Sequence, residues 1–286
     1  MHYLSQHSQF KKLLIALLRK RLSCFCLCIL LGYLLVTVWV KTGWLFPNWD
    51  TIVGASHEPP SWTHCFGTDI LGYSVLAKVI HGVAVAMHVG CMVALFATAI
   101  GVVLGIVAGY FGGTIDECVV WLYTVIGSIP TLLSLIVVAF IMGRGIQSCC
   151  IALVVVGWTD ICRLIRGEVM RHRSREYIQA AAAIGAGNFR KLFIHILPNI
   201  LSLITYQFSL TFQFAIKYEV ILSYLGLGVQ HKPSWGLMIG EAKTELLKDV
   251  WWGLFFPVVA MFVLLFAVNM LADALRDELD PKLRSQ

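Results

Sequence analysis

The amino-acid sequence predicts an all-α membrane protein with six transmembrane helices and with both termini in the cytoplasm. Three observations lead to this fold class. Of the 286 residues, 58% are hydrophobic and 13% are charged, and the mean hydropathy of +0.79 lies far outside soluble usage. The apolar residues form long runs. The basic residues gather in alternate connections between those runs.

Each apolar run is long enough to cross a membrane, because a hydrocarbon core of about 30 Å needs about 20 apolar residues in a helix. The first run follows basic residues, as a secretory signal does, but no small-residue cleavage site follows it. We therefore expect an uncleaved anchor. The predicted spans cover residues 22–40, 85–110, 118–142, 146–165, 198–224 and 251–272.

The basic residues set the predicted orientation. With the N-terminus inside, the cytoplasmic segments hold 15 Lys and Arg residues and the opposite segments hold 6. Since cytoplasmic loops are enriched in Lys and Arg, both termini are placed in the cytoplasm. The net charge of +6 then reflects topology and contact with membrane lipid. It does not indicate nucleic-acid binding, because no basic face with interleaved aromatic residues is present.

The chain is expected to form one membrane domain. Its parts are a cytoplasmic N-terminal segment (1–21), the first span (22–40), a periplasmic segment (41–84), a core with five spans (85–275) that contains a cytoplasmic loop (167–197), and a cytoplasmic tail (276–286). Residues 111–116 predict a tight inner loop. Residues 229–250 predict a loop followed by a short amphipathic helix.

The stretch EYIQAAAAIGAGNFRKLFIHILPN, residues 176–199, predicts a helix-turn-helix at the inner face. The alanines are strong helix formers, Ser174 and Asn188 are expected to cap the two helices, and Gly185 ends the first. One face of the first helix carries Tyr177, Ile178, Ala181 and Ile184 at helical spacing. This pattern leaves two interpretations open: a helix that rests on lipid, or a docking helix for a cytoplasmic partner.

The same stretch resembles the EAA loop of ATP-binding-cassette importer permeases, in which Glu-Ala-Ala is followed by Gly and then by Ile-x-Leu-Pro. Gln179 stands where that pattern has Glu, and His195 stands where it has Ile. The resemblance implies that this loop couples the chain to an ATPase subunit. The coupling residues it implies are Tyr177, Gln179, Ala180, Ala181, Ala182, Ile184, Gly185, Phe189, Leu197 and Pro198.

Three further stretches narrow the resemblance to the dipeptide/oligopeptide (peptide/nickel) permease subfamily, and to its C-type subunit. They are FGTDILGYSVLAKVIHG (66–82), YLGLGVQHKPSWGLMI (224–239) and LADALRDELDPKLRS (271–285). In the first of them, Tyr73-Ser74 and Ala77-Lys78 replace the usual Arg-Asp and Ser-Arg, so contacts of those residues are not carried over.

The resemblance implies a permease subunit of a bacterial cytoplasmic-membrane importer that works by alternating access. Its implied partners are a second homologous permease, two cytoplasmic ATP-binding subunits and a periplasmic substrate-binding protein. No GxxxxGK[ST] loop and no Gly-Lys pair occur in the sequence. ATP and Mg²⁺ are therefore expected on the partner subunits, with no cofactor and no catalytic residue in this chain. The implied cargo is a di- or oligopeptide, with nickel or a metal chelate as the alternative.

A few polar residues near the spans are candidates for a translocation pathway. Lys217 and Glu219 lie near the outer end of the fifth span, where they either line an outer vestibule or are simply interfacial. His88, with Met87, Cys91 and Met92 nearby, suggests a soft-metal site, but ordinary packing is favoured over a metal site. Asp160, Arg163 and Arg166 are expected to end the fourth span in salt bridges or headgroup contacts.

The sequence does not favour an ion-coupled secondary transporter, which is a different class of transporter. An ion-coupled secondary transporter would need charged relays in broken mid-membrane helices and, usually, repeated halves. Neither feature is evident in the sequence.

Overall fold

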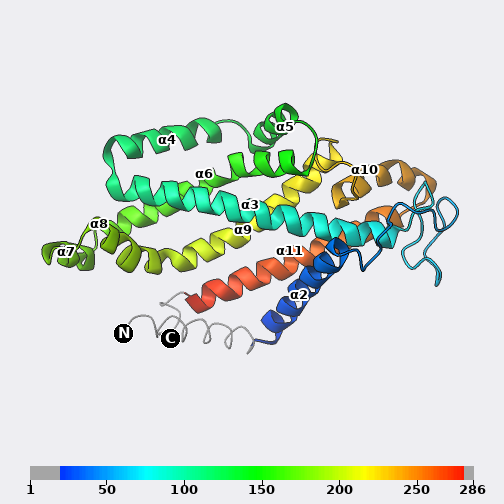
Figure 1. Ribbon diagram of the computed structural model, residues 1–286, viewed down its shortest axis with the longest axis horizontal. Helices are drawn as coiled ribbons and strands as arrows, with labels where there is room; N and C mark the ends of the chain where they lie inside the picture. Colours follow the sequence, from blue (N-terminus) through cyan, green and yellow to red (C-terminus); the bar gives the residue numbers. More distant parts are fainter. Residues whose placement is uncertain (1–19, 280–286) are drawn as a thin grey trace.

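The computed structural model describes residues 20–279. The predicted segment 1–21 lies almost wholly outside these residues, as does most of the predicted tail 276–286. The described chain is a bundle in which long helices run along the longest axis of the molecule (Figure 1).

The long helices are α2 (Arg21–Lys41), α3 (Val75–Phe111), α6 (Ile146–Arg173), α9 (Leu197–Tyr224) and α11 (Trp252–Leu279). Within residues 20–279, five helical segments are long and apolar enough to cross a membrane, and six spans result if one bent pair of helices counts as a single span. This confirms the predicted all-α, multi-span fold. The shorter elements are α4 (Gly113–Gly127), α5 (Thr131–Met142), α7 (Glu176–Ala183), α8 (Asn188–Arg190), the π-helical η1 (Lys191–Ile196), α10 (Trp235–Glu245) and the 3-10 helix η2 (Leu246–Lys248).

The third predicted span is not one continuous helix. Helices α4 and α5 meet at an angle of 90°, so the expectation of a single helix over 118–142 is wrong. Pro130 lacks a backbone N–H and disfavours helical conformation in the residue before it. Next to the break, the Ser128 hydroxyl shares its hydrogen bond between the carbonyls of Thr124 (2.9 Å) and Val125 (2.8 Å) at the end of α4.

Helix α3 begins ten residues before the predicted start, at Val75 instead of residue 85. Ser74 caps it by accepting a hydrogen bond from the backbone N–H of Ala77, 3.4 Å away. At its other end, Gly112 alone separates α3 from α4, with a φ of +70° that favours glycine. The predicted loop at 111–116 is therefore reduced to a single residue.

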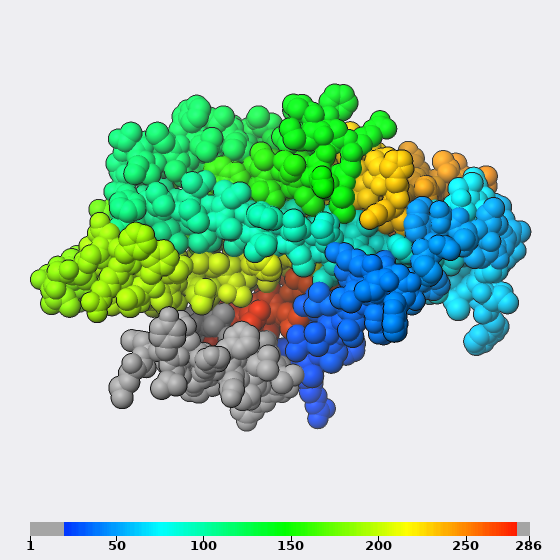
Figure 2. Space-filling view, viewed as in Figure 1, coloured from blue at the N-terminus to red at the C-terminus, as the bar shows by residue number. Residues whose placement is uncertain are grey.

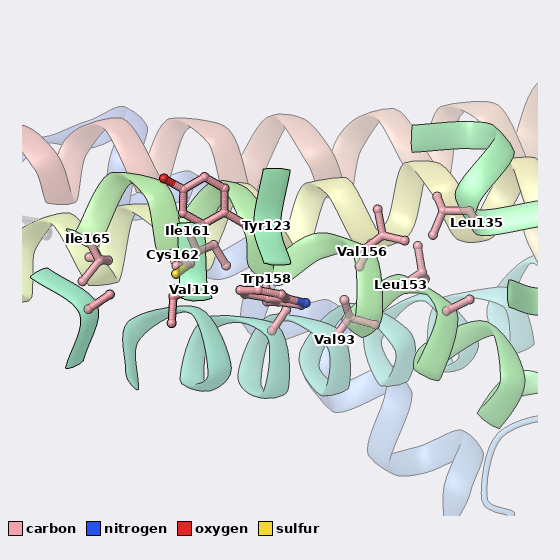
Figure 3. Close-up of a cluster of buried hydrophobic side chains, with 14 of the residues drawn as sticks. Val93, Val119, Tyr123, Leu135, Leu153, Val156, Trp158, Ile161, Cys162 and Ile165 are labelled. Carbon is pink, nitrogen blue, oxygen red and sulfur yellow. The ribbon is translucent and has the colours of Figure 1, made fainter. Parts of the chain in front are cut away.

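The core of the bundle lies where α3 packs against α6 and α9. A stripe of glycines on α3, spaced four residues apart, brings its backbone close to α6. An added Cβ at Gly101, Gly105 or Gly109 would approach atoms of α6 within 2.6–2.8 Å. Figure 3 shows the buried side chains beside this contact, among them Trp158 and Ile161 of α6.

Helix α10 is fixed to α3 by a buried tryptophan. Trp235 is 1% exposed, and its indole N–H donates to the carbonyl of Val79 over 3.1 Å. The side chain fits because Gly82 has no Cβ; one there would lie 2.4 Å from the indole ring. The predicted loop and short helix at 229–250 are thus confirmed. In Figure 1, α10 lies at the end of the bundle opposite α7 and α8.

Candidate functional site

Helices α7 and α8 form a tip that projects from one end of the bundle (Figures 1 and 2). The predicted cap of the first helix is wrong. Ser174 is the last residue of the turn that ends α6, where its hydroxyl donates to the carbonyl of Arg171 over 3.0 Å. Arg175, in an extended conformation, is the residue that precedes α7.

The inner face of α7 rests on the protein core. Ile178 and Ala181 are 4% and 7% exposed, and Ile178 belongs to a buried cluster with Leu192 and Ile196 of η1. Ala181 was expected on the docking surface, and the structure places it on this supporting face. The four residues predicted to share one face therefore lie in two environments: Ile178 and Ala181 are buried, whereas Tyr177 is 39% and Ile184 86% exposed.

Gly185 ends α7 in a Schellman turn. The N–H of Ala186 bonds to the carbonyl of Ala181 (2.9 Å), and the N–H of Gly185 bonds to that of Ala182 (3.0 Å). This turn needs a left-handed residue, and Gly185 has a φ of +81°. The left-handed backbone conformation therefore explains why the EAA-like pattern has a glycine at position 185.

Substituting Gly185 by alanine is expected to destabilise the tip by about 1 kcal/mol, because a Cβ is disfavoured in the left-handed region. Gly187→Ala is the matched control: neither glycine has a heavy atom within 4 Å of its added Cβ, but Gly187 has a φ of −65°. Hydrogen exchange of residues 176–196 should accelerate in the first variant only. Equal exchange in both variants would contradict the conformational explanation.

The second helix of the tip is the beginning of a span. Residues 188–224 are helical without interruption through α8, η1 and α9. The wide π-helical η1 precedes Pro198, whose ring cannot be accommodated in a regular α-helical turn. Asn188 does not cap this helix as predicted. It is the first helical residue, and its side chain accepts a hydrogen bond from Tyr110 of α3 (3.0 Å).

The outer surface of the tip is apolar and exposed. Ile184 is 86% and Phe189 79% exposed, and Phe189 stacks on Phe193 with ring centroids 5.3 Å apart. Gln179 is exposed too, and its side-chain amide donates to the carbonyl of Ser174 (3.3 Å). Such a patch on a projecting element is typical of an interaction surface. The other predicted coupling residues are exposed (Ala180, Ala182, Gly185, Pro198) or half-buried (Leu197).

Tyr177 ties the tip to the end of α6. Its hydroxyl lies 2.6 Å from Nδ1 of His172. Burial raises the pKa of the Tyr177 hydroxyl, so it remains a neutral phenol at physiological pH.

The three predicted pathway residues lie in different environments. Glu219 is 1% exposed, and its carboxylate accepts a hydrogen bond from the Ser223 hydroxyl over 2.7 Å. Lys217 is exposed. Helix α9 continues beyond both residues to Tyr224, and their position relative to the membrane interface stays a prediction. His88 is half-buried and lines a cavity of about 520 Å³ between α3 and α6, together with Met92 and Cys150.

Asp160, Arg163 and Arg166 were expected to end the fourth span, but α6 continues to Arg173. Arg166 does form the expected salt bridge, through two hydrogen bonds to Asp116 of α4; its Nη2 lies 2.6 Å from Oδ2. Asp160 and Arg163 instead line a cavity next to the break between α4 and α5. Charged residues beside a broken helix pair are therefore present, a combination that hydropathy alone does not reveal.

A bundle of long apolar helices with a projecting helical tip at one end defines an integral membrane protein with several spans. A family of bacterial membrane proteins matches residues 101–285, and its description is "Binding-protein-dependent transport system inner membrane component". The chain belongs to this family. It is a multi-pass protein of the bacterial inner membrane and a permease subunit of an ATP-binding-cassette transport system.

Curated relatives share most of the chain. The dipeptide transport system permease protein DppC of Bacillus subtilis (strain 168) is 41% identical over 79% of this chain and 71% of its own length. The oligopeptide transport system permease protein OppC of the same strain is 36% identical over 79% and 74%. The di/tripeptide transport system permease protein DppC of Pseudomonas aeruginosa (strain UCBPP-PA14) is 31% identical over 89% and 88%.

Proposed function

We propose that this chain is the permease subunit of an ATP-driven importer for di- or oligopeptides, which a periplasmic binding protein delivers. The relatives named for dipeptide, di/tripeptide and oligopeptide transport support the cargo class. A second permease related to this chain completes the pathway, and two cytoplasmic subunits bind ATP and Mg²⁺. The chain itself has no nucleotide site, in keeping with the absence of a GxxxxGK[ST] loop from the sequence.

The exposed apolar tip carries this proposal. Its surface offers Ile184 and Phe189 to a partner, while Ile178 and Ala181 hold it rigidly on the core. A coupling element must have both properties, because a flexible one would absorb the motion it has to transmit. The excess of Lys and Arg in the segments on this side supports a cytoplasmic location for the tip and for both termini.

Two structural connections join the tip directly to the spans and would transmit its motion. The first is α9, which continues from the tip as an unbroken helix to Tyr224 near α10. The second is the hydrogen bond between Tyr110 and Asn188, which joins the tip to the end of α3. ATP-driven closure of the partner subunits would push on the tip, and these connections would turn the push into opening of the pathway to the opposite side.

Uptake by the reconstituted complex tests the proposal. The chain, its partner permease and the ATPase subunits are placed in proteoliposomes with ATP inside and dialanine-loaded binding protein outside. We expect accumulation of labelled dialanine that requires both ATP and the binding protein. Uptake driven by an ion gradient without ATP would contradict the proposal and would favour a secondary transporter.

A further inference from the structure

A polar cavity lies among the spans, at the break between α4 and α5. Its volume is about 290 Å³. The end of α4, the break and the start of α5 line it, together with parts of α6 and α9 that contribute Gly157, Asp160, Arg163, Gln207, Leu210 and Phe214. Discontinuous helices of this kind form the substrate sites of many transporters, because they expose polar backbone groups inside the membrane.

Two opposite charges lie in this cavity, on a helix that is long and apolar enough to cross a membrane. Asp160 is 14 residues from the first residue of α6, Ile146, and Arg163 is 17. At about 1.5 Å per residue, these positions are about 21 and 26 Å along the helix, so a span that begins at Ile146 would hold both within a hydrocarbon core of about 30 Å. Ionisable residues at such a depth are costly, and by default they mark a pathway or a partner.

The two charges are available to a ligand. Residues three apart on a helix share a face, so both side chains point to the same side of α6. In the part of the chain that the structure describes, Asp160 has neither a hydrogen bond nor an ion pair, and the side-chain amide of Gln207 has no hydrogen bond. Arg163 has a π partner instead: its guanidinium carbon lies 5.1 Å from the ring centre of Tyr123, which Figure 3 shows on α4.

The walls of the cavity leave room for a small molecule. Two of the lining residues are glycines, and a Cβ on Gly157 would lie 3.3 Å from the ring of Phe214. Sites for small molecules typically measure about 300–1,000 Å³. The cavity lies just below this range, and Asp160 and Arg163 are both exposed on the surface of the single chain. A related permease packed on this side would complete the enclosure.

We propose that this cavity binds the zwitterionic backbone of a peptide during translocation, with Asp160 receiving the terminal ammonium group and Arg163 the terminal carboxylate. A carboxylate and a guanidinium on one helix face complement the two charged ends of a short peptide. The inference rests on the proposed function and adds to it a second recognition step within the permease. The side chains of the cargo would meet the apolar wall formed by Leu210 and Phe214.

The test uses the full complex in proteoliposomes, with dialanine as the cargo. Asp160→Asn and Arg163→Gln should each lower dialanine uptake about tenfold, with ATP hydrolysis stimulated by the loaded binding protein unchanged within about twofold. The conservative variants Asp160→Glu and Arg163→Lys should retain most of the uptake, since they keep the charge. Matched controls are Glu117→Gln and Arg144→Gln, which remove exposed charges outside the cavity.

Several results would overturn the inference. Unchanged uptake in the charge-loss variants would show that the cargo does not contact the two charges. Uptake and ATP hydrolysis that fall together, or that fall equally in the conservative variants, would assign these residues a structural role. Loss of the partner permease from the purified complex would assign them to the subunit interface. The wild-type complex serves as the reference for the proposed function. If it imports dialanine and the variants behave as just described, only the inference about the cavity fails; if it imports no dialanine, the proposed function itself fails.

Discussion

Ile184→Asp is expected to abolish ATP-driven uptake in a chain that still folds. Ile184 is 86% exposed, so the substitution removes little packing from the chain itself. In the docked complex the aspartate would be a buried, unpaired charge, which costs about 3–5 kcal/mol. Since each 1.4 kcal/mol is a factor of ten, docking should weaken by more than about a hundredfold. Co-purification of the ATPase subunit with the variant measures this loss directly.

The matched control for Ile184→Asp is Leu247→Asp. Leu247 is 89% exposed and lies on η2, which follows α10. Its substitution therefore replaces an exposed apolar side chain by aspartate at a site outside the tip. We expect Leu247→Asp to retain the ATPase subunit. If the Ile184 variant also retained the subunit and imported dialanine at the normal rate, the tip would not be the docking surface.

Trp235→Ala is expected to destabilise the protein by about 3–5 kcal/mol, as large-to-small substitutions of buried aromatic residues do. The indole is 1% exposed and fills the space above Gly82, so its removal leaves a cavity and frees the carbonyl of Val79 from its hydrogen bond. Helix α10 would lose its main attachment to α3. The midpoint of thermal unfolding of the purified protein in detergent measures the effect.

Trp62→Ala provides the comparison for Trp235→Ala, because Trp62 is fully exposed, at 103%. Surface substitutions usually change stability by less than about 0.5 kcal/mol. The unfolding midpoint of Trp62→Ala should therefore stay near that of the wild type. Equal shifts in the two variants would show that Trp235 does not anchor α10.

The spans were predictable because their physical cause is local: a helix in lipid must carry a long apolar run, and the sequence shows such runs directly. The beginning of α3 was not predictable in this way, because the charge of Lys78 interrupts the apolar run in residues 75–84. The structure neutralises this lysine with Asp69, 2.6 Å away, a pairing that the sequence alone does not reveal. The bend at Pro130 was not predicted, because hydropathy gives the length of an apolar run and contains no information about the direction of the helix axis.

The tip was predicted in its position and in the role of Gly185, because a left-handed turn limits the choice of residue. Ala181 was misplaced because periodicity identifies a face without saying what it touches; only the fold shows that Leu192 and Ile196 lie beneath α7. Asp160 and Arg163 were misplaced for another reason. A cluster of charges after an apolar run usually marks the end of a span, whereas here α6 continues to Arg173.

Cysteine crosslinking from the tip tests the central claim most directly. Ala182 is exposed on the outer side of α7, and Ala182→Cys would be made in a variant whose exposed native cysteines (Cys28, Cys65, Cys91 and Cys118) are replaced by serine. In membranes that contain all the subunits, we expect a crosslink to an ATPase subunit whose yield changes with ATP. An assembled complex in which Cys at position 182 forms no such crosslink would contradict the coupling role of the tip.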